Sequence, residues 1–307
     1  MIPVLISPIK SYPVILASIL PPPITTSLDK TDCDDEFLYA KPARQAVSLI
    51  EYRSRNRSPN RINYKKQFPG SILLHQQYRM HPSICAFASA VFYDSLLSTP
   101  SFLAEMRPFP DALKSICPVG GVSVGVRFVN VGGQRNEHRG EASSGAEIPD
   151  AISIEASTSF SNKAEAEHII FILKSLIGRC KNAASVPESI GIITPYTAQV
   201  SMIKTLLDDP ELADLLKYAP TTIEVKTVDA YQGRERDIII FSAVRSNRVS
   251  QIGFLSDWRR MNVAMTRAKS GLIVVGDKDT LKGGDLHWEA FIKWCESSCV
   301  MTELNMQ

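Results

Sequence analysis

The chain has 307 residues, 44% of them hydrophobic and 21% charged, which is the composition of an ordinary globular protein with one large or two small domains. A formal net charge of +2 does not indicate a nucleic-acid-binding protein, and it does not exclude one with a local basic groove. The six cysteines show no paired zinc-ligand spacing, so we expect no metal site, no disulfide framework and a reducing compartment.

Residues 1–70 are expected to form an irregular N-terminal segment. Lys10 and several prolines interrupt every apolar run at its start, which argues against a transmembrane helix and a signal peptide, so we expect no membrane partner. Within this segment, residues 13–17 favour a short buried strand. The basic run at 53–61 is typical of a solvated loop, with a nucleic-acid contact as the alternative.

A strand at 71–74 is followed by a helix that begins at Pro82, a residue suited to the first helical position. The apolar residues that follow fall on one helical face: Ile84, Phe87, Ala88, Val91 and Phe92. Tyr78 and Arg79 therefore lie at a strand-to-helix junction, where a ring can stack on a base and a guanidinium can pair with a phosphate. The alternative is a tyrosine packed under the helix beside a surface arginine.

The next segment alternates between ordered and irregular stretches. Residues 124–131 alternate in polarity as a strand does. Residues 133–160 are rich in Gly, Ser, Glu and Ala, which predicts a flexible insertion with no chemistry of its own. Asn162 and Glu165 form an N-cap pattern at the start of a strongly amphipathic helix whose apolar stripe belongs to the core.

A short buried strand at 190–193 ends in three residues that follow it directly, Thr194, Pro195 and Tyr196. A helix is expected over 197–207, with its apolar side chains turned inward.

A polar turn between two strand-like runs is the most informative stretch of the chain. The alternating run 223–228 leads into it and the apolar run 237–241 leads out. Its polar side chains are Asp229, Gln232, Arg234 and Glu235. Polar groups at the end of a parallel strand usually face a ligand, and an ordinary charged loop is the alternative.

The last part of the chain predicts a helix over 257–269, a strand at 272–275 and a helix over about 287–294. Strands that alternate with helices predict a parallel α/β sheet with helices on both faces. In such a sheet Thr194, Asp229 and Gln232 lie at the carboxyl ends of strands, the usual ligand edge. Arg267 comes just before a strand, and periodicity alone leaves its edge open.

Four motifs, taken in this order, are specific as a set: 77–82 (QYRMHP), 193–196 (ITPY), 227–235 (TVDAYQGRE) and 260–269 (RMNVAMTRAK). Together they resemble the second, C-terminal RecA-like domain of superfamily 1B helicases of the senataxin and nonsense-mediated-decay type. The resemblance covers about residues 71–297 and leaves 298–307 as a tail. It implies the P-loop NTPase fold and ATP-driven unwinding of RNA or DNA.

The resemblance also implies a role for each residue that matches a motif. Tyr78 would stack on the base of ATP, Arg79 would reach its terminal phosphates, and Arg267 would act as the arginine finger. Glu235 would hold the nucleotide near the ribose, and Gly233 would let the backbone approach. Gln232 joins Arg79 and Arg267 as a candidate catalytic residue. The single-strand groove would be lined by Thr194, Pro195, Tyr196, Thr227, Asp229 and Asn262.

The sequence contains no G-x-x-x-x-G-K-[ST] phosphate loop and no acidic pair after an apolar strand. Residues 20–22 (LPP) look like the end of a first RecA-like domain that lacks the family's Gly-Asp and Gln, or like a proline-rich tail with a chance match. We therefore expect a first domain, in a longer chain or in trans, to hold most of the Mg²⁺, and this chain alone to be inactive. The expected location is the nucleus or cytoplasm.

Two other classes of function compete with this one. A catalytically inactive RecA-like module that binds nucleic acid or a partner helicase is the alternative. An unrelated nucleotide-binding or metabolic domain is disfavoured because no Gly-rich loop follows any expected strand.

Overall fold

The structure is a computed structural model that describes residues 74–112, 125–132, 136–139, 159–179, 186–218, 221–298 and 300–303. The expectations for residues 1–70, including the strand at 13–17 and the basic run at 53–61, lie outside the described residues, as do most of the 133–160 insertion and the end of the tail.

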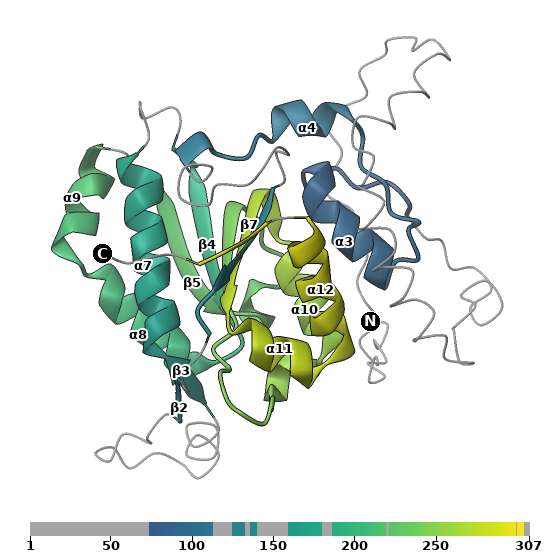
Figure 1. Ribbon diagram of the computed structural model, residues 1–307. Helices are drawn as coiled ribbons and strands as arrows, with labels where there is room; N and C mark the ends of the chain where they lie inside the picture. Colours follow the sequence, from purple (N-terminus) through teal and green to yellow (C-terminus); the bar gives the residue numbers. More distant parts are fainter. Residues whose placement is uncertain are drawn as a thin grey trace, which may run out of the picture.

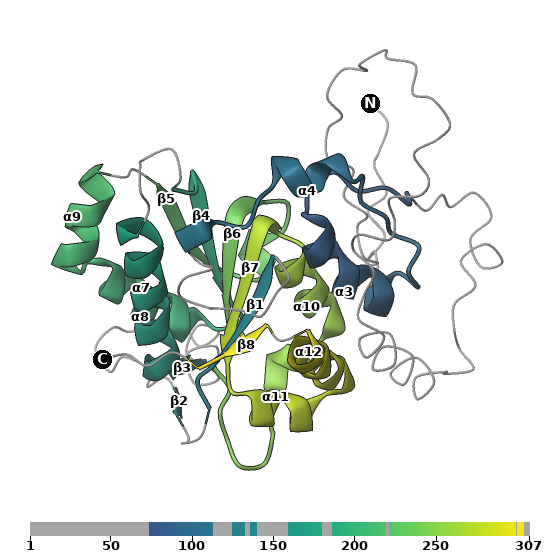
Figure 2. The same ribbon diagram turned by 45° about the horizontal axis from the view of Figure 1, so that its top comes forward.

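The described residues form a six-stranded sheet in the order β5-β4-β6-β7-β1-β8, and every strand pair in it is parallel (Figures 1 and 2). The strands are β1 Val126–Asn130, β4 Ser189–Thr194, β5 Thr222–Thr227, β6 Arg236–Ser242, β7 Ala268–Gly276 and β8 Met301–Thr302. A separate antiparallel pair joins β2 Glu137–Arg139 to β3 Phe160–Asn162. The predicted parallel α/β, RecA-like fold is therefore confirmed.

Helices cover both faces of the sheet (Figure 1). On one face lie α7 Lys163–Gly178, α8 Thr197–Leu207 and α9 Pro210–Tyr218. On the other lie α3 Pro82–Phe92, α10 Trp258–Met265, α11 Lys278–Gly284 and α12 Leu286–Ser297. The short helix α4 Phe102–Met106 follows α3. Each face has its own apolar cluster, as expected for a sheet buried on both sides.

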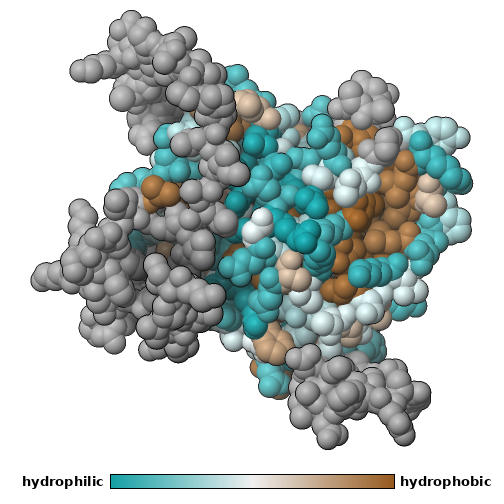
Figure 3. All heavy atoms as spheres, turned by 180° about the vertical axis from the view of Figure 1, so that it is seen from behind, coloured by the Kyte–Doolittle hydropathy of each residue, from teal (hydrophilic) through white to brown (hydrophobic). Residues whose placement is uncertain are grey.

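Apolar surface remains at the edge of the sheet where β5 lies. In the view from behind, hydrophobic side chains gather around a hollow on the side of the molecule that carries α8, α9 and β5 (Figure 3). Half-buried apolar residues of these elements are Met202, Leu206, Leu207, Leu215, Leu216 and Ile223. Of the residues that the motifs singled out, β5 carries Thr227 as its last residue.

Most expected elements are present. The helix α3 begins at Pro82 as predicted, and α8 has the predicted bounds 197–207. Asn162 caps α7 by accepting a hydrogen bond from the Glu165 backbone N–H. The short elements α4, α9, α11, β2, β3 and β8 were not predicted. Strand β2 lies inside the segment expected to be a flexible insertion without chemistry, and its Glu137 carries a structural role described below.

The helix predicted over 257–269 is shorter than expected. It ends at Met265, and β7 begins at Ala268, which pairs with Arg236 of β6. The Thr266 hydroxyl donates to the Asn262 carbonyl oxygen at 2.8 Å and closes the last turn. From residue 268 onwards the backbone pairs with β6 as a strand, so the helix cannot continue to residue 269.

The polar turn after β5 crosses the sheet. Thr227 ends β5 level with Thr194 of β4, yet Arg236 starts β6 at the opposite, amino-terminal edge. In between, Tyr231 is buried over the middle of β4, where a Cβ built on Gly191 would lie 2.1 Å from the Tyr231 hydroxyl oxygen. The missing side chain at Gly191 is what lets the crossover lie against the sheet.

Replacing Gly191 with alanine should therefore destabilise the fold. We expect a loss of about 1–3 kcal/mol in the free energy of unfolding, because the methyl group overpacks a buried ring. Gly178→Ala is the matched control, since a Cβ there meets nothing closer than Leu215 Cδ2 at 3.5 Å. Urea unfolding of both variants measures the difference, and equal stabilities would show that Tyr231 can move aside.

Candidate functional site

Three of the predicted nucleotide residues meet at the amino-terminal edge of β6 and β7. Glu235 and Arg267 directly precede these strands and are neighbours, because the Arg236 N–H donates to the Arg267 carbonyl oxygen at 3.2 Å. The segment that carries Arg79 joins them through the His81 N–H, which donates to the Lys269 carbonyl oxygen at 2.8 Å. The crossover between β5 and β6 and the segment before α3 thus bring Arg79, Glu235 and Arg267 together, although more than 150 residues of sequence separate Arg79 from the other two.

Arg79 and Glu235 form an ion pair. The Arg79 Nε lies 2.5 Å from Glu235 Oε2, and Arg79 Nη1 donates to the Thr266 carbonyl oxygen at 3.1 Å. Lys269 Nζ lies 3.6 Å from the other Glu235 carboxylate oxygen. Burial alone would raise the pKa of Glu235, but Arg79 and Lys269 outweigh it and hold that pKa below its usual value.

Arg267 is buried, with 3% of its surface exposed. Its Nε donates to the Val263 carbonyl oxygen at 2.9 Å and its Nη2 donates to Thr266 Oγ1 at 3.1 Å. Its Nη1 is buried without a hydrogen-bond partner among the described residues. Burial and the nearby Arg79 charge lower the Arg267 pKa to about 10, so the guanidinium remains charged at neutral pH. A charged donor without an acceptor favours an anion beside it.

Sequence analysis did not single out Lys269. It was assigned to the end of a helix, whereas it is the second residue of β7 and lies next to Glu235. Three cations therefore gather around one glutamate at this edge, with Asp237 Oδ1 3.9 Å from Lys269 Nζ as a second, more distant acid.

The remaining nucleotide candidates lie close in sequence to this cluster. Tyr78 is half-buried and its hydroxyl donates to Gln76 Oε1 at 2.8 Å. Gln232 and Gly233 are exposed on the crossover. Gly233 has φ +81° and open space where a Cβ would lie, so backbone conformation rather than close packing requires glycine there.

At the carboxyl-terminal edge of the sheet, the expected single-strand residues differ in accessibility. Thr194 and Tyr196 are buried, and the Tyr196 hydroxyl donates to the Ile252 carbonyl oxygen at 3.3 Å. Pro195 and Thr227 are half-buried, whereas Asp229 is exposed. The side chains of Thr194 and Tyr196 therefore support this edge from within, which leaves Pro195, Thr227 and Asp229 accessible to a single strand.

Asn262 has a different environment from the other expected strand contacts. It is buried in α10, and its Nδ2 donates to the Tyr93 hydroxyl at 2.9 Å. The backbone carbonyl oxygen of Asn262 accepts a hydrogen bond from the Thr266 hydroxyl, which also contacts Arg267. The structure thus links Asn262 to the arginine cluster rather than to Thr194 and Thr227.

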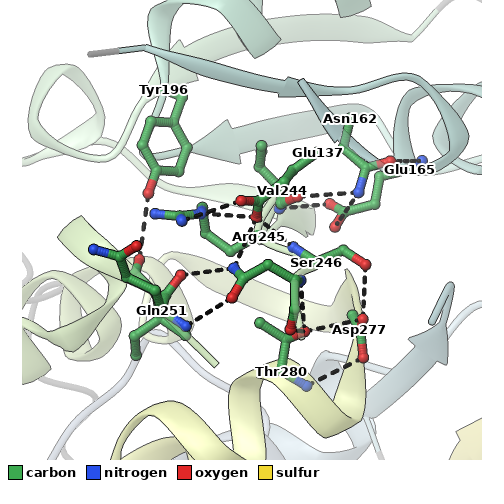
Figure 4. A network of polar contacts seen from close by, with 12 residues as sticks. Glu137, Asn162, Glu165, Tyr196, Val244, Arg245, Ser246, Gln251, Asp277 and Thr280 are labelled. Carbon is green, nitrogen blue, oxygen red and sulfur yellow. Dashed lines mark hydrogen bonds and ion pairs between the residues drawn. The ribbon is translucent and has the colours of Figure 1, made fainter. Parts of the chain in front are cut away.

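A polar network below the carboxyl-terminal edge was missed by sequence analysis (Figure 4). Val244, just after β6, has φ +70°, which is an outlier for a β-branched residue. Glu165 Oε2 accepts the Val244 N–H at 2.8 Å and the Ser242 hydroxyl at 2.7 Å. Asn162 Nδ2 donates to the Val244 carbonyl oxygen at 3.0 Å, so the backbone of Val244 is held at both its N–H and its carbonyl group.

Glu137 of β2 fixes the residues that follow. Its carboxylate accepts Arg245 Nε at 2.9 Å, the Ser246 N–H at 2.7 Å and Asn247 Nδ2 at 3.0 Å. The Ser246 hydroxyl donates to Asp277 Oδ2 at 2.7 Å. The backbone N–H groups of residues 243–247 all have acceptors within the protein, so this loop is a rigid support and not a phosphate cradle.

Burial dominates the titration of Glu165. It raises the pKa of Glu165 to about 8, against the hydrogen bonds from Ser242 and Val244, and the charge of Asp277 adds to the rise. Among the described residues, no group of three or more His, Cys, Asp or Glu side chains is arranged to hold a metal ion. No helix in the described part of the chain is long and apolar enough to cross a membrane.

The parallel sheet with helices on both faces is that of a RecA-like α/β domain. A family model described as an AAA domain matches residues 60–279, and the chain belongs to this family as the C-terminal RecA-like domain of a superfamily 1B helicase.

Three relatives illustrate the similarity. Helicase sen1 of Schizosaccharomyces pombe is 33% identical over 235 residues, covering 75% of this chain and 12% of that protein. Regulator of nonsense transcripts 1 homolog of Drosophila melanogaster is 36% identical over 230 residues, covering 75% and 17%. DNA polymerase alpha-associated DNA helicase A of S. pombe is 31% identical over 233 residues, covering 76% and 32%. The chain therefore spans less than a third of the length of each of them.

Proposed function

We propose that this chain supplies one half of the ATP site and part of the single-strand groove of an ATP-dependent helicase acting on RNA or DNA. The observation that carries the proposal is the convergence of Arg79, Glu235 and Arg267, with the buried Nη1 of Arg267 lacking an acceptor among the described residues. The cationic surplus of this cluster suits the charge of a triphosphate.

The residues present fit ATP. Bound ATP would supply the phosphoryl group whose transfer drives strand movement, with negative charge spreading over the γ-phosphate oxygens. Arg267 would stabilise that charge and Arg79 would orient the terminal phosphates. The Tyr78 ring would stack on the base, Glu235 would accept a ribose hydroxyl and Gly233 would bring the backbone close. Gln232, exposed on the crossover, is the candidate to orient water.

Turnover requires parts that this chain does not show. A first RecA-like domain, in the same polypeptide or in trans, would add the phosphate loop and most of the Mg²⁺ ligands. The alternative function is a module that binds nucleic acid or a partner helicase without turnover. Such a module would still bind a single strand at the carboxyl-terminal edge of the sheet, but it would not hydrolyse ATP. The nucleus or cytoplasm remains the proposed location.

An experiment with and without a first domain separates these functions. We expect the chain alone to bind a fluorescent ADP weakly and to hydrolyse almost no ATP, and expect turnover stimulated by single strands once a first RecA-like domain is joined to it. Robust hydrolysis by this chain alone, abolished by Arg267→Ala, would contradict the assignment of an incomplete site. Strand binding without any turnover in the joined protein would favour the binding module.

Binding to single strands should be salt-dependent. We expect micromolar affinity for a single-stranded oligonucleotide at low salt, falling steeply as salt rises, because backbone phosphates release counterions when they meet basic side chains. Fluorescence anisotropy over a salt series measures this. Absence of binding at low salt would remove the single-strand part of the proposal.

A further inference from the structure

An exposed aromatic ring lies at the carboxyl-terminal edge of the sheet. Phe254 belongs to the short helix η4 Gly253–Ser256 and is 48% exposed, whereas its neighbours Ile252 and Leu255 are buried. The backbone is therefore anchored on both sides of a ring that points outward. A large apolar side chain presented in this way leaves a surface on which another flat group can pack.

Contacts from below fix the position of this ring. The buried Tyr196 ring lies 5.9 Å from the Phe254 ring, centroid to centroid, and its hydroxyl bonds to the Ile252 carbonyl oxygen. Gly253 has φ +56°, and a Cβ there would lie 2.9 Å from Arg245 Nη1. The turn thus closes against Tyr196 and Arg245, and the ring is held in place before any ligand arrives.

A guanidinium stands beside the ring. The Arg260 guanidinium carbon lies 5.2 Å from the Phe254 ring centroid. Arg260 Nε and Nη2 donate to the two carboxylate oxygens of Asp229, at 3.2 and 3.0 Å, and this bidentate pair orients the guanidinium. Asp229 comes two residues after Thr227, so the ring and the guanidinium adjoin the edge proposed to hold a single strand.

We propose that Phe254 is a stacking platform for one base of a single-stranded nucleic acid, and that Arg260, oriented by Asp229, contacts the adjacent backbone phosphate. The proposal rests on the proposed function and adds to it a base contact that none of the four motifs contains. An exposed ring next to a guanidinium is the combination that single-strand-binding proteins use, because every base has a face to stack and every linkage carries a charge.

The test compares a normal single-stranded oligonucleotide with an abasic one of equal length, by fluorescence anisotropy on the full chain. Phe254→Leu should weaken binding of the normal oligonucleotide by about 5- to 100-fold, because stacking on one base is lost. The same variant should bind the abasic oligonucleotide as tightly as the unmodified chain does. Phe254→Trp should retain the affinity. Arg260→Gln should weaken binding of both oligonucleotides and reduce the salt slope by about one.

Phe102→Leu is the matched control, since Phe102 is 50% exposed in α4 and far from this edge in sequence. It should change neither affinity. Equal weakening of both oligonucleotides by Phe254→Leu would show a structural role and overturn the platform, as would no change at all. If the unmodified chain binds neither oligonucleotide, the single-strand part of the proposed function fails as well. A loss confined to the normal oligonucleotide supports the platform.

Discussion

Replacing Arg267 with alanine is expected to lower ATP turnover about a thousandfold or more in a protein that joins this chain to a first RecA-like domain. The physical reason is that a guanidinium offsets charge that develops only in the transition state. Arg267 keeps its charge at neutral pH although burial lowers its pKa to about 10. Its Nη1, buried and without a partner in the described structure, is the donor available for a phosphate oxygen.

Steady-state turnover and nucleotide affinity should be measured together for this variant. If Arg267 is the arginine finger, its loss lowers turnover far more than it lowers the affinity for ADP, because ADP lacks the γ-phosphate. Arg259→Ala is the matched control, because Arg259 is an exposed arginine of α10, the helix that ends two residues before Arg267. Turnover within a few-fold of the unmodified protein would show that another cation serves as the finger, and Lys269 would then be the next residue to replace.

Local patterns predicted the sheet and most of its helices because apolar periodicity records which side of each element is buried. The resemblance assigned Arg79 and Glu235 to one nucleotide but did not predict their ion pair, and no local pattern could, since 156 residues separate the two. Lys269 was missed for a local reason, because the α10 pattern continues smoothly past the residue where pairing with β6 takes over. Tertiary pairing decided that boundary, and local propensity did not record it.

Glu165 shows a different limit. Its place in an N-cap pattern was correctly recognised, but its main partners Ser242 and Val244 lie 77 and 79 residues away. Nothing local marks Val244 as a residue with positive φ, since that conformation usually selects glycine or asparagine. The strained conformation of Val244 persists because Glu165 accepts a hydrogen bond from its N–H and Asn162 donates one to its carbonyl oxygen.

Removing the Glu165 side chain should therefore have the largest effect on stability. Glu165→Ala leaves the Val244 N–H and the Ser242 hydroxyl without their acceptor and releases a strained backbone, and we expect a loss of about 3 kcal/mol or more in the free energy of unfolding. Glu165→Gln keeps one acceptor oxygen in nearly the same shape and should lose about 1–2 kcal/mol. Glu167→Ala, on the same helix but less buried, is the control.

The pH dependence separates burial from hydrogen bonding at this carboxyl group. The Glu165 pKa is raised from 4.5 to about 8 in the folded protein, so between these values the folded state keeps a proton that the unfolded state releases. The contribution of Glu165 is therefore fully present below about pH 4.5 and is lost as pH rises towards 8, by at most about 1.4 kcal/mol per pH unit. Glu165→Gln cannot titrate, so its deficit against the unmodified protein should shrink as pH rises.

Urea unfolding of both proteins at several values between pH 5 and 8 measures that deficit. A deficit that stays constant would mean that Glu165 is ionised throughout, because the donors from Ser242, Val244 and Asn162 then outweigh the cost of burying the charge. A shrinking deficit would mean that a neutral carboxylic acid holds Val244 in its strained conformation. The loop of residues 243–247 would then loosen in alkaline solution.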